Sequence, residues 1–206
     1  MTRIENTSWR FCVAVGSVSL CLCIFLDLFY FPADTIFPDE RRFLASATHL
    51  ANTWSFTVRG DRAWEMPGTA AVFATFAWLF SSAHAAIVPI RLAQAMLLLF
   101  QAVLIGQIAQ RIFEDRATGL VAFTITAFYP FFLYYQGLLL SETLFNTFLI
   151  AAFASLYWWR DRRLRMDAAL ILTCVCFALA TYIKATMTLF PPFLVAVATL
   201  GARDCA

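Results

Sequence analysis

The adjacent carboxylates Asp39 and Glu40 are the residues of this sequence best suited to chemistry. They follow the first long apolar segment, in the sequence Phe-Pro-Asp-Glu-Arg-Arg-Phe. A membrane protein keeps ionised groups mainly where an apolar segment meets water, or in a polar cavity. Two carboxylates at such a boundary can take a proton from an acceptor group or hold a cation. The structural alternative is a helix start, because a proline followed by acidic residues is typical of a first helical turn.

Four further charged residues could complete a site. Arg91 and Lys184 could bind a phosphate, Arg through a bidentate fork and Lys as a compact charge, or their side chains could simply reach lipid headgroups. Glu142 could orient a substrate hydroxyl, pair with Arg91 or Lys184, or stabilise a helix start behind Ser141. Glu65 could play the same orienting role or close its own loop against a neighbouring arginine.

The sequence does not predict a metal site. His49 and His84 are far apart and lack ligand spacing. A divalent cation could bind the acidic pair, but the ligand set is incomplete there. Asp27, inside the first apolar segment, is expected to bond to a neighbouring helix or to reach the membrane interface, and it is not assigned to catalysis.

The composition is that of an integral membrane protein in contact with lipid. Of the 206 residues, 62% are apolar and 14% are charged, and the mean hydropathy is +0.74. Soluble domains are closer to half apolar and a quarter charged. A net charge of +2 without a basic aromatic patch argues against nucleic-acid binding.

The hydropathy pattern predicts one all-α membrane module over residues 1–206, with about six transmembrane helices. A helix needs about 20 apolar residues to cross the hydrocarbon core. The first span is expected at 11–31, and a large outer loop over 32–90 contains an interfacial helix at 68–84. Five further spans are expected within 91–204, at about 91–112, 118–135, 139–159, 168–184 and 186–200.

The distribution of basic residues sets the expected orientation. The basic segment 160–165 and the loop between Arg111 and Arg116 should both be cytoplasmic by the positive-inside rule. They can share that side only if residues 68–84 do not cross the membrane. Both ends of the chain are then expected inside, and the candidate site residues converge on the outer face.

Several short motifs follow one another in a characteristic order. They are Asp39-Glu40, Pro67-Gly68, Ile-Arg-Leu-Ala-Gln at 90–94, Ala-Phe-Tyr-Pro at 127–130 and Leu-Ser-Glu-Thr-Leu-Phe at 140–145. This order resembles that in the N-terminal module of the polyprenyl-phosphate-dependent glycosyltransferases of the C superfamily. The greatest similarity is to the bacterial family-39-like branch, which includes protein mannosyltransferases and aminoarabinose transferases of lipid A.

The resemblance implies an inverting glycosyltransferase of a bacterial inner membrane, with its active face outward. It would move a hexose or pentose from a polyprenyl-phosphate donor to a hydroxyl of a lipid, glycan or protein acceptor. Asp39 is then the expected catalytic base, with Glu40 as its neighbour. Family members are usually longer, and they often carry Arg-Pro where this chain has Lys184-Ala185. A truncated or split version completed by a partner chain is therefore one expectation, and a non-catalytic membrane carrier or partner subunit is the alternative.

Overall fold

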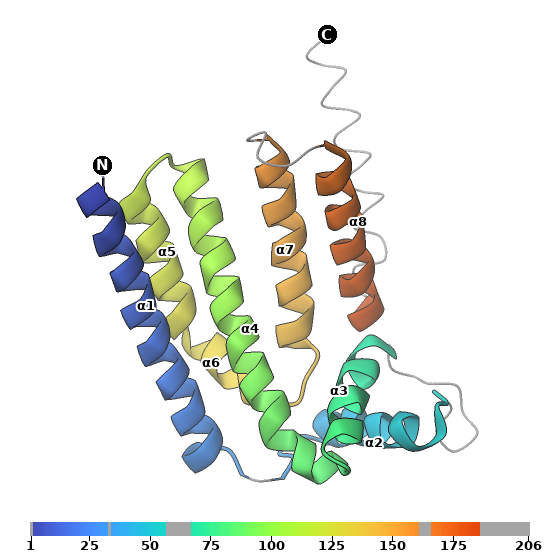
Figure 1. The fold of residues 1–206 in the computed structure, drawn as a ribbon. Coiled ribbons are helices and arrows are strands. Elements are labelled where there is room, and N and C mark those ends of the chain that lie inside the picture. The colour runs from blue at the N-terminus through green and yellow to red at the C-terminus, as the bar shows by residue number, and fades with distance from the viewer. Residues whose placement is uncertain (1, 33, 57–66, 161–165, 186–206) are drawn as a thin grey trace.

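The structure, a computed structural model, describes residues 2–32, 34–56, 67–160 and 166–185, and the regular structure in these ranges is helical throughout (Figure 1). The elements are α1 Thr2–Phe25, the π-helical turn η1 Leu26–Tyr30, α2 Pro38–Thr53, α3 Pro67–Leu79, α4 Ala83–Ile112, α5 Arg116–Phe128, α6 Pro130–Gln136, α7 Glu142–Arg160 and α8 Met166–Ile183. The all-α class predicted from the sequence is confirmed for this part of the chain.

Helix α4 is central to the bundle, because it contacts α1, α2, α3, α5, α6 and α7. The helices α1, α4, α5, α7 and α8 stand side by side, while α2 lies across one end and packs on α3 (Figure 1). The short helix α6 lies at the same end as α2. Most of the irregular segments that could carry a site are therefore gathered at one end of the bundle.

The prediction of six transmembrane helices is wrong for the described part of the chain. Two helices are long and apolar enough to cross a membrane, Trp9–Tyr30 and Ala83–Ile112, and a third span is counted if α5 and α6 act together. Helix α3 has only 13 residues, and the apolar part of α8, Ala168–Ile183, is also short. Helix α7 begins with polar residues, which lower its mean hydropathy. The span expected at 186–200 lies outside the described residues.

The span expected at 118–135 is broken in two. Helix α5 ends at Phe128, Tyr129 is extended with φ −65° and ψ 120°, and α6 starts at Pro130 with its axis bent by 48°. Proline lacks a backbone N–H and disfavours helical geometry in the preceding residue, so the break follows from the sequence.

The interfacial helix expected at 68–84 is shorter than predicted. Helix α3 ends at Leu79, and a turn with Ser81 at φ 59° separates it from α4. Ser82 caps α4, since its hydroxyl accepts a hydrogen bond of 3.1 Å from the amide of Ala85. Residues 83–90 thus extend the second span, and Arg91, expected at its start, lies inside α4.

Glycines allow α4 and α5 to approach closely. A Cβ atom on Gly119 would lie 2.7 Å from Cβ of Gln110 and 2.9 Å from the carbonyl oxygen of Gly106. Both distances are too short for a real Cβ contact, so a side chain at position 119 would force the helices apart.

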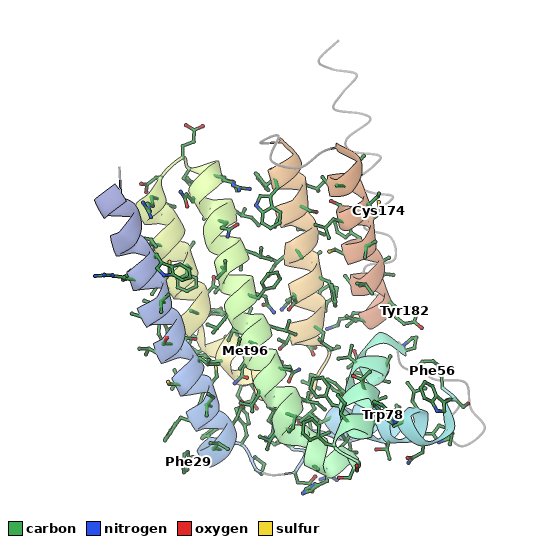
Figure 2. All side chains as sticks on the ribbon, in the orientation of Figure 1. Phe29, Phe56, Trp78, Met96, Cys174 and Tyr182 are labelled. Atoms are coloured by element: carbon green, nitrogen blue, oxygen red, sulfur yellow. The ribbon has the colours of Figure 1, made fainter. Side chains whose placement is uncertain are left out.

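The outer surface of the bundle carries many large apolar side chains. Phe29 on η1 and Met96 on α4 are both more than half exposed, and Trp78 on α3 is similar (Figure 2). Extended apolar surface of this kind is rare on soluble monomers and suits contact with lipid. Together with the two to three candidate spans, it supports a membrane location.

Candidate functional site

The structure places the two members of the acidic pair, Asp39 and Glu40, in different environments. Pro38 is the first residue of α2, so Asp39 and Glu40 both lie in its first turn, as the helix-start alternative predicted. The side chain of Asp39 is 69% exposed and forms an ion pair of 3.6 Å with Arg42. Asp39 therefore presents its carboxylate to the surroundings, where it could accept a proton.

Glu40, in contrast, is fully buried and bound to three backbone amides. Its Oε1 accepts hydrogen bonds of 2.9 Å from the amides of both Ile36 and Phe37. Its Oε2 accepts a bond of 3.0 Å from the amide of Leu139, in the segment between α6 and α7. Both carboxylate oxygens are thus occupied, which makes Glu40 a structural residue that ties α2 to this segment.

Arg91 is buried as deeply as Glu40 and binds the segment before α2. Its Nη1 donates a 2.8 Å bond to the carbonyl of Pro32, and its Nη2 donates a longer bond of 3.5 Å to the carbonyl of Asp34. Its guanidinium also lies 5.5 Å from the centre of the Phe31 ring. The sequence pointed to a phosphate ligand at Arg91, whereas in this structure its guanidinium binds the backbone carbonyls of Pro32 and Asp34.

Two buried acids surround this arginine. Asp27 and Glu40 both interact electrostatically with the Arg91 guanidinium. Oδ1 of Asp27 also accepts a hydrogen bond of 3.5 Å from the amide nitrogen of Gln136, at the end of α6. This contact agrees with the bond to a neighbouring helix expected for Asp27. Gln136 was not identified from the sequence, since a glutamine in an apolar segment carries no signal of its partner.

The segment between η1 and α2 is also fixed by its own side chains. The amide of Thr35 donates a 2.7 Å bond to Oδ1 of Asp34, and this bond holds the pKa of Asp34 below its usual range. The hydroxyl of Thr35 accepts a bond of 3.2 Å from Nε of Arg41. Asp39 therefore follows a segment held by local hydrogen bonds and by Arg91.

Glu142 and Lys184 pair with each other. Nζ of Lys184 lies 3.0 Å from Oε1 of Glu142, and both side chains are about one-third exposed. The sequence left open whether Glu142 pairs with Arg91 or with Lys184, and in the structure its partner is Lys184. The ammonium group also lies 5.9 Å from the centre of the Phe145 ring.

A cavity of about 260 Å³ lies beside Glu142, between α4, α6 and α7. Its polar residues include Gln101, Glu142 and Asn146, while Phe131 and Tyr135 contribute aromatic surface. Of these residues, only Glu142 was singled out from the sequence. The others come from three helices, and their convergence could not be deduced from local spacing.

Two further expectations concern Glu65 and a metal site. Glu65, the sixth predicted site residue, lies outside the described residues. Among the residues that the structure describes, no group of three or more His, Cys, Asp or Glu side chains is placed to hold a metal ion.

Of the predicted site residues that the structure describes, Asp39 and Glu40 lie in the first turn of α2, Glu142 begins α7, and Lys184 directly follows α8. The bond from Leu139 to Glu40 connects α2 to the segment before α7, and the bonds from Arg91 to Pro32 and Asp34 connect α4 to the segment before α2. Glu40 and Arg91 thus both bind the segment before α2, and Glu40 also binds the segment that leads into Glu142 at the start of α7. Comparison with protein-family models, with curated proteins and with solved structures finds no match to this chain.

Proposed function

We propose that this chain is a membrane glycosyltransferase, or the N-terminal module of one, that uses a polyprenyl-phosphate sugar as donor. The observation that carries the proposal is that the two carboxylates of the acidic pair have different environments. Glu40 is used for structure, and its neighbour Asp39 is left exposed on a segment that is anchored on both sides. A fixed, accessible carboxylate at the end of a helical bundle is what a general base for an outer-face reaction requires.

The proposed reaction is a single displacement at the anomeric carbon. Asp39 takes the proton of the acceptor hydroxyl as the hydroxyl oxygen forms its bond to the anomeric carbon. The bond between that carbon and the phosphate oxygen breaks, and its electron pair leaves with the polyprenyl phosphate. Attack opposite the leaving group inverts the configuration of the sugar.

The charged neighbours have separate proposed roles. Lys184 would offset the negative charge that develops on the departing phosphate, because its ammonium group is partly exposed. Glu142 would orient a substrate hydroxyl next to it. Arg91 is assigned to positioning, because its guanidinium already binds the carbonyls of Pro32 and Asp34. We keep the outer face of a bacterial inner membrane as the proposed location, on the basis of Arg111 at the end of α4 and Arg116 at the start of α5, at the other end of the bundle (Figure 1).

The test is sugar transfer by bacterial membranes that contain the full chain. Polyprenyl phosphates carrying radiolabelled mannose, glucose or aminoarabinose serve as donors, and label in lipid, glycan and protein fractions is counted. Asp39→Asn keeps the size of the side chain but removes the base, and it should lower transfer by about 10²–10⁴-fold. Glu114→Gln is the matched control, because Glu114 is an exposed acid in the turn between α4 and α5 at the other end of the bundle.

Two outcomes would refute the proposal. Unchanged transfer by the Asp39→Asn variant would exclude this residue as the base. Absence of transfer by the wild-type chain, with its helical content intact by circular dichroism, would exclude catalysis by this chain alone and favour a non-catalytic partner subunit.

A further inference from the structure

The cavity between α4, α6 and α7 has the size of a site for a small ligand. Its volume of about 260 Å³ is slightly below the range of ~300–1,000 Å³ typical of sites for drug-sized molecules. Residues of all three helices line it, among them Gln101 of α4, Phe132 of α6 and Asn146 of α7. A single small ring would fill much of this space.

The cavity wall combines aromatic and polar surface. Phe131, Phe132 and Tyr135 form the side contributed by α6. Glu142 and Asn146, one helical turn apart on α7, contribute a carboxylate and an amide. An amide both donates and accepts hydrogen bonds, whereas a carboxylate only accepts them. This set suits a ligand that has several hydroxyl groups and an apolar face.

Other classes of ligand fit the wall less well. An anion such as a free phosphate would face the carboxylate of Glu142, and none of the described residues that line the cavity is a Lys or an Arg. A cation would compete with Lys184, which already pairs with that carboxylate at 3.0 Å. A hydrocarbon chain would leave the side-chain amide of Asn146 without a hydrogen-bond partner. A neutral polyhydroxylated ring satisfies both surfaces, because its C–H groups can lie on an aromatic ring while its hydroxyls bond to α7.

Buried contacts hold the polar side of the cavity in place. Gln101 is almost fully buried, and its amide nitrogen donates bonds of 2.9 Å to the carbonyl of Thr143 and 2.7 Å to the hydroxyl of Thr147. These bonds fix the first turns of α7 against α4. The ion pair with Lys184 restrains Glu142 from the α8 side. A site restrained in this way loses little entropy when a ligand binds.

One backbone contact also links the segment before α7 to α2, the helix that carries the proposed catalytic base. Glu142 follows Leu139 by three residues, and the amide of Leu139 is bound by Glu40, the neighbour of Asp39. We infer that the cavity between α4, α6 and α7 binds one sugar ring through Glu142 and Asn146 of α7 and the aromatic side chains of α6. This inference rests on the proposed function, because it assigns the bound ring to the transfer reaction.

Direct binding tests the inference without turnover. The full chain in lipid nanodiscs is titrated calorimetrically with geranyl phosphate carrying mannose, glucose or aminoarabinose, with sugar-free geranyl phosphate, and with the methyl glycosides of the same sugars. At least one sugar should raise affinity over geranyl phosphate or bind as its methyl glycoside. Affinity gained only on the phosphate carrier would identify the donor ring, and binding of a methyl glycoside alone would identify an acceptor ring.

Variants locate the ring. Asn146→Ala should weaken sugar-dependent binding by about tenfold, the loss of roughly one hydrogen bond. Tyr135→Leu, which removes an aromatic surface and leaves α7 unchanged, should weaken it as well. Asn52→Ala, the same change at an exposed asparagine of α2, should have no effect. Wild-type affinity in both cavity variants, or no contribution of any sugar to binding, would overturn the inference.

The two proposals can fail separately. Sugar binding that depends on Asn146 without transfer by the wild-type chain would overturn the enzyme and leave the cavity site standing. Transfer that depends on Asp39, with sugar binding indifferent to Asn146 and Tyr135, would overturn the cavity site alone.

Discussion

Replacement of Glu40 by glutamine should destabilise the protein, although the change removes only a charge and adds no bulk. The Glu40 side chain is fully buried, and Oε1 accepts the amides of Ile36 and Phe37 while Oε2 accepts that of Leu139. In the glutamine variant, the amide oxygen can keep the first two bonds. Its NH₂ group then faces the amide of Leu139, and two donors cannot bond to each other.

The expected magnitude follows from this one lost bond. A hydrogen bond to a charged group contributes ~1.5–3 kcal/mol, and a buried donor left without a partner costs a similar amount. We therefore expect Glu40→Gln to lower the free energy of unfolding by about 2 kcal/mol. Glu40→Ala leaves all three amides without this partner, so its loss should be at least ~3 kcal/mol. Against a typical total of ~5–15 kcal/mol, both losses are measurable.

The assay is unfolding in mixed micelles by titration with sodium dodecyl sulfate, followed by far-ultraviolet circular dichroism. Asp39→Asn is the matched control, because it makes the same chemical change at an exposed side chain and should alter the free energy of unfolding by about 0.5 kcal/mol or less. Equal stability of Glu40→Gln and Asp39→Asn would refute the structural role of Glu40. In the sugar-transfer assay the order should reverse. Asp39→Asn should lose transfer, and Glu40→Gln should keep it once its lower stability is accounted for.

Two further predictions concern the α4–α5 hairpin. Gly119→Ala would place its Cβ 2.9 Å from the carbonyl of Gly106 and should cost ~1–3 kcal/mol in the same assay. Gly16→Ala should not destabilise, because its Cβ would meet the Phe123 ring at an ordinary contact distance of 3.8 Å, and equal effects of the two changes would contradict the close approach. The hydroxyl and amide of Thr118 hold the pKa of Asp115 below its usual range, so this carboxylate contributes stability above about pH 4 that is lost as the pH falls through its folded pKa. Asp115→Asn should therefore flatten this acid-side loss in thermal unfolding between pH 7 and pH 3, and a slope identical to that of the wild type would contradict it.

Local signals predicted the helical class and several element positions well. The first span, the short helix after Pro67 and the start of α2 at Pro38 all follow from hydropathy or from the position of a proline. The helix break at Pro130 was also readable from the sequence, although it was assigned to a continuous span. The span count failed because hydropathy alone does not separate a helix that crosses a membrane from a short helix packed among others.

The placement of Arg91 shows where sequence reasoning reached its limit. An arginine in an apolar segment was assigned to the end of a span, since exposure to water is the usual way to keep its charge. The structure instead places it inside α4, where the carbonyls of Pro32 and Asp34 accept hydrogen bonds from its guanidinium. These contacts join positions more than fifty residues apart, so no local pattern could reveal them.

The acidic pair illustrates the same limit within the candidate site. Asp39 and Glu40 are chemically alike and adjacent, and the sequence assigned both to catalysis. The place of both residues in a first helical turn was readable, because they follow Pro38. The bond between Glu40 and Leu139, which is 99 residues away, was not. This distant contact is what makes Glu40 structural and leaves Asp39 as the candidate base.

The two buried charges also explain how irregular backbone can persist at this end of an apolar bundle. Segments 31–32, 34–37 and 137–141 are not helical, so many of their amides and carbonyls lack the partners that a helix supplies. Arg91 donates to carbonyls of the first two segments, and Glu40 accepts amides from the last two. Each charge is thereby paired with backbone groups that would otherwise be costly to bury. The same contacts hold the segments before α2 and before α7 in one geometry, and from these helix starts Asp39 and Glu142 project.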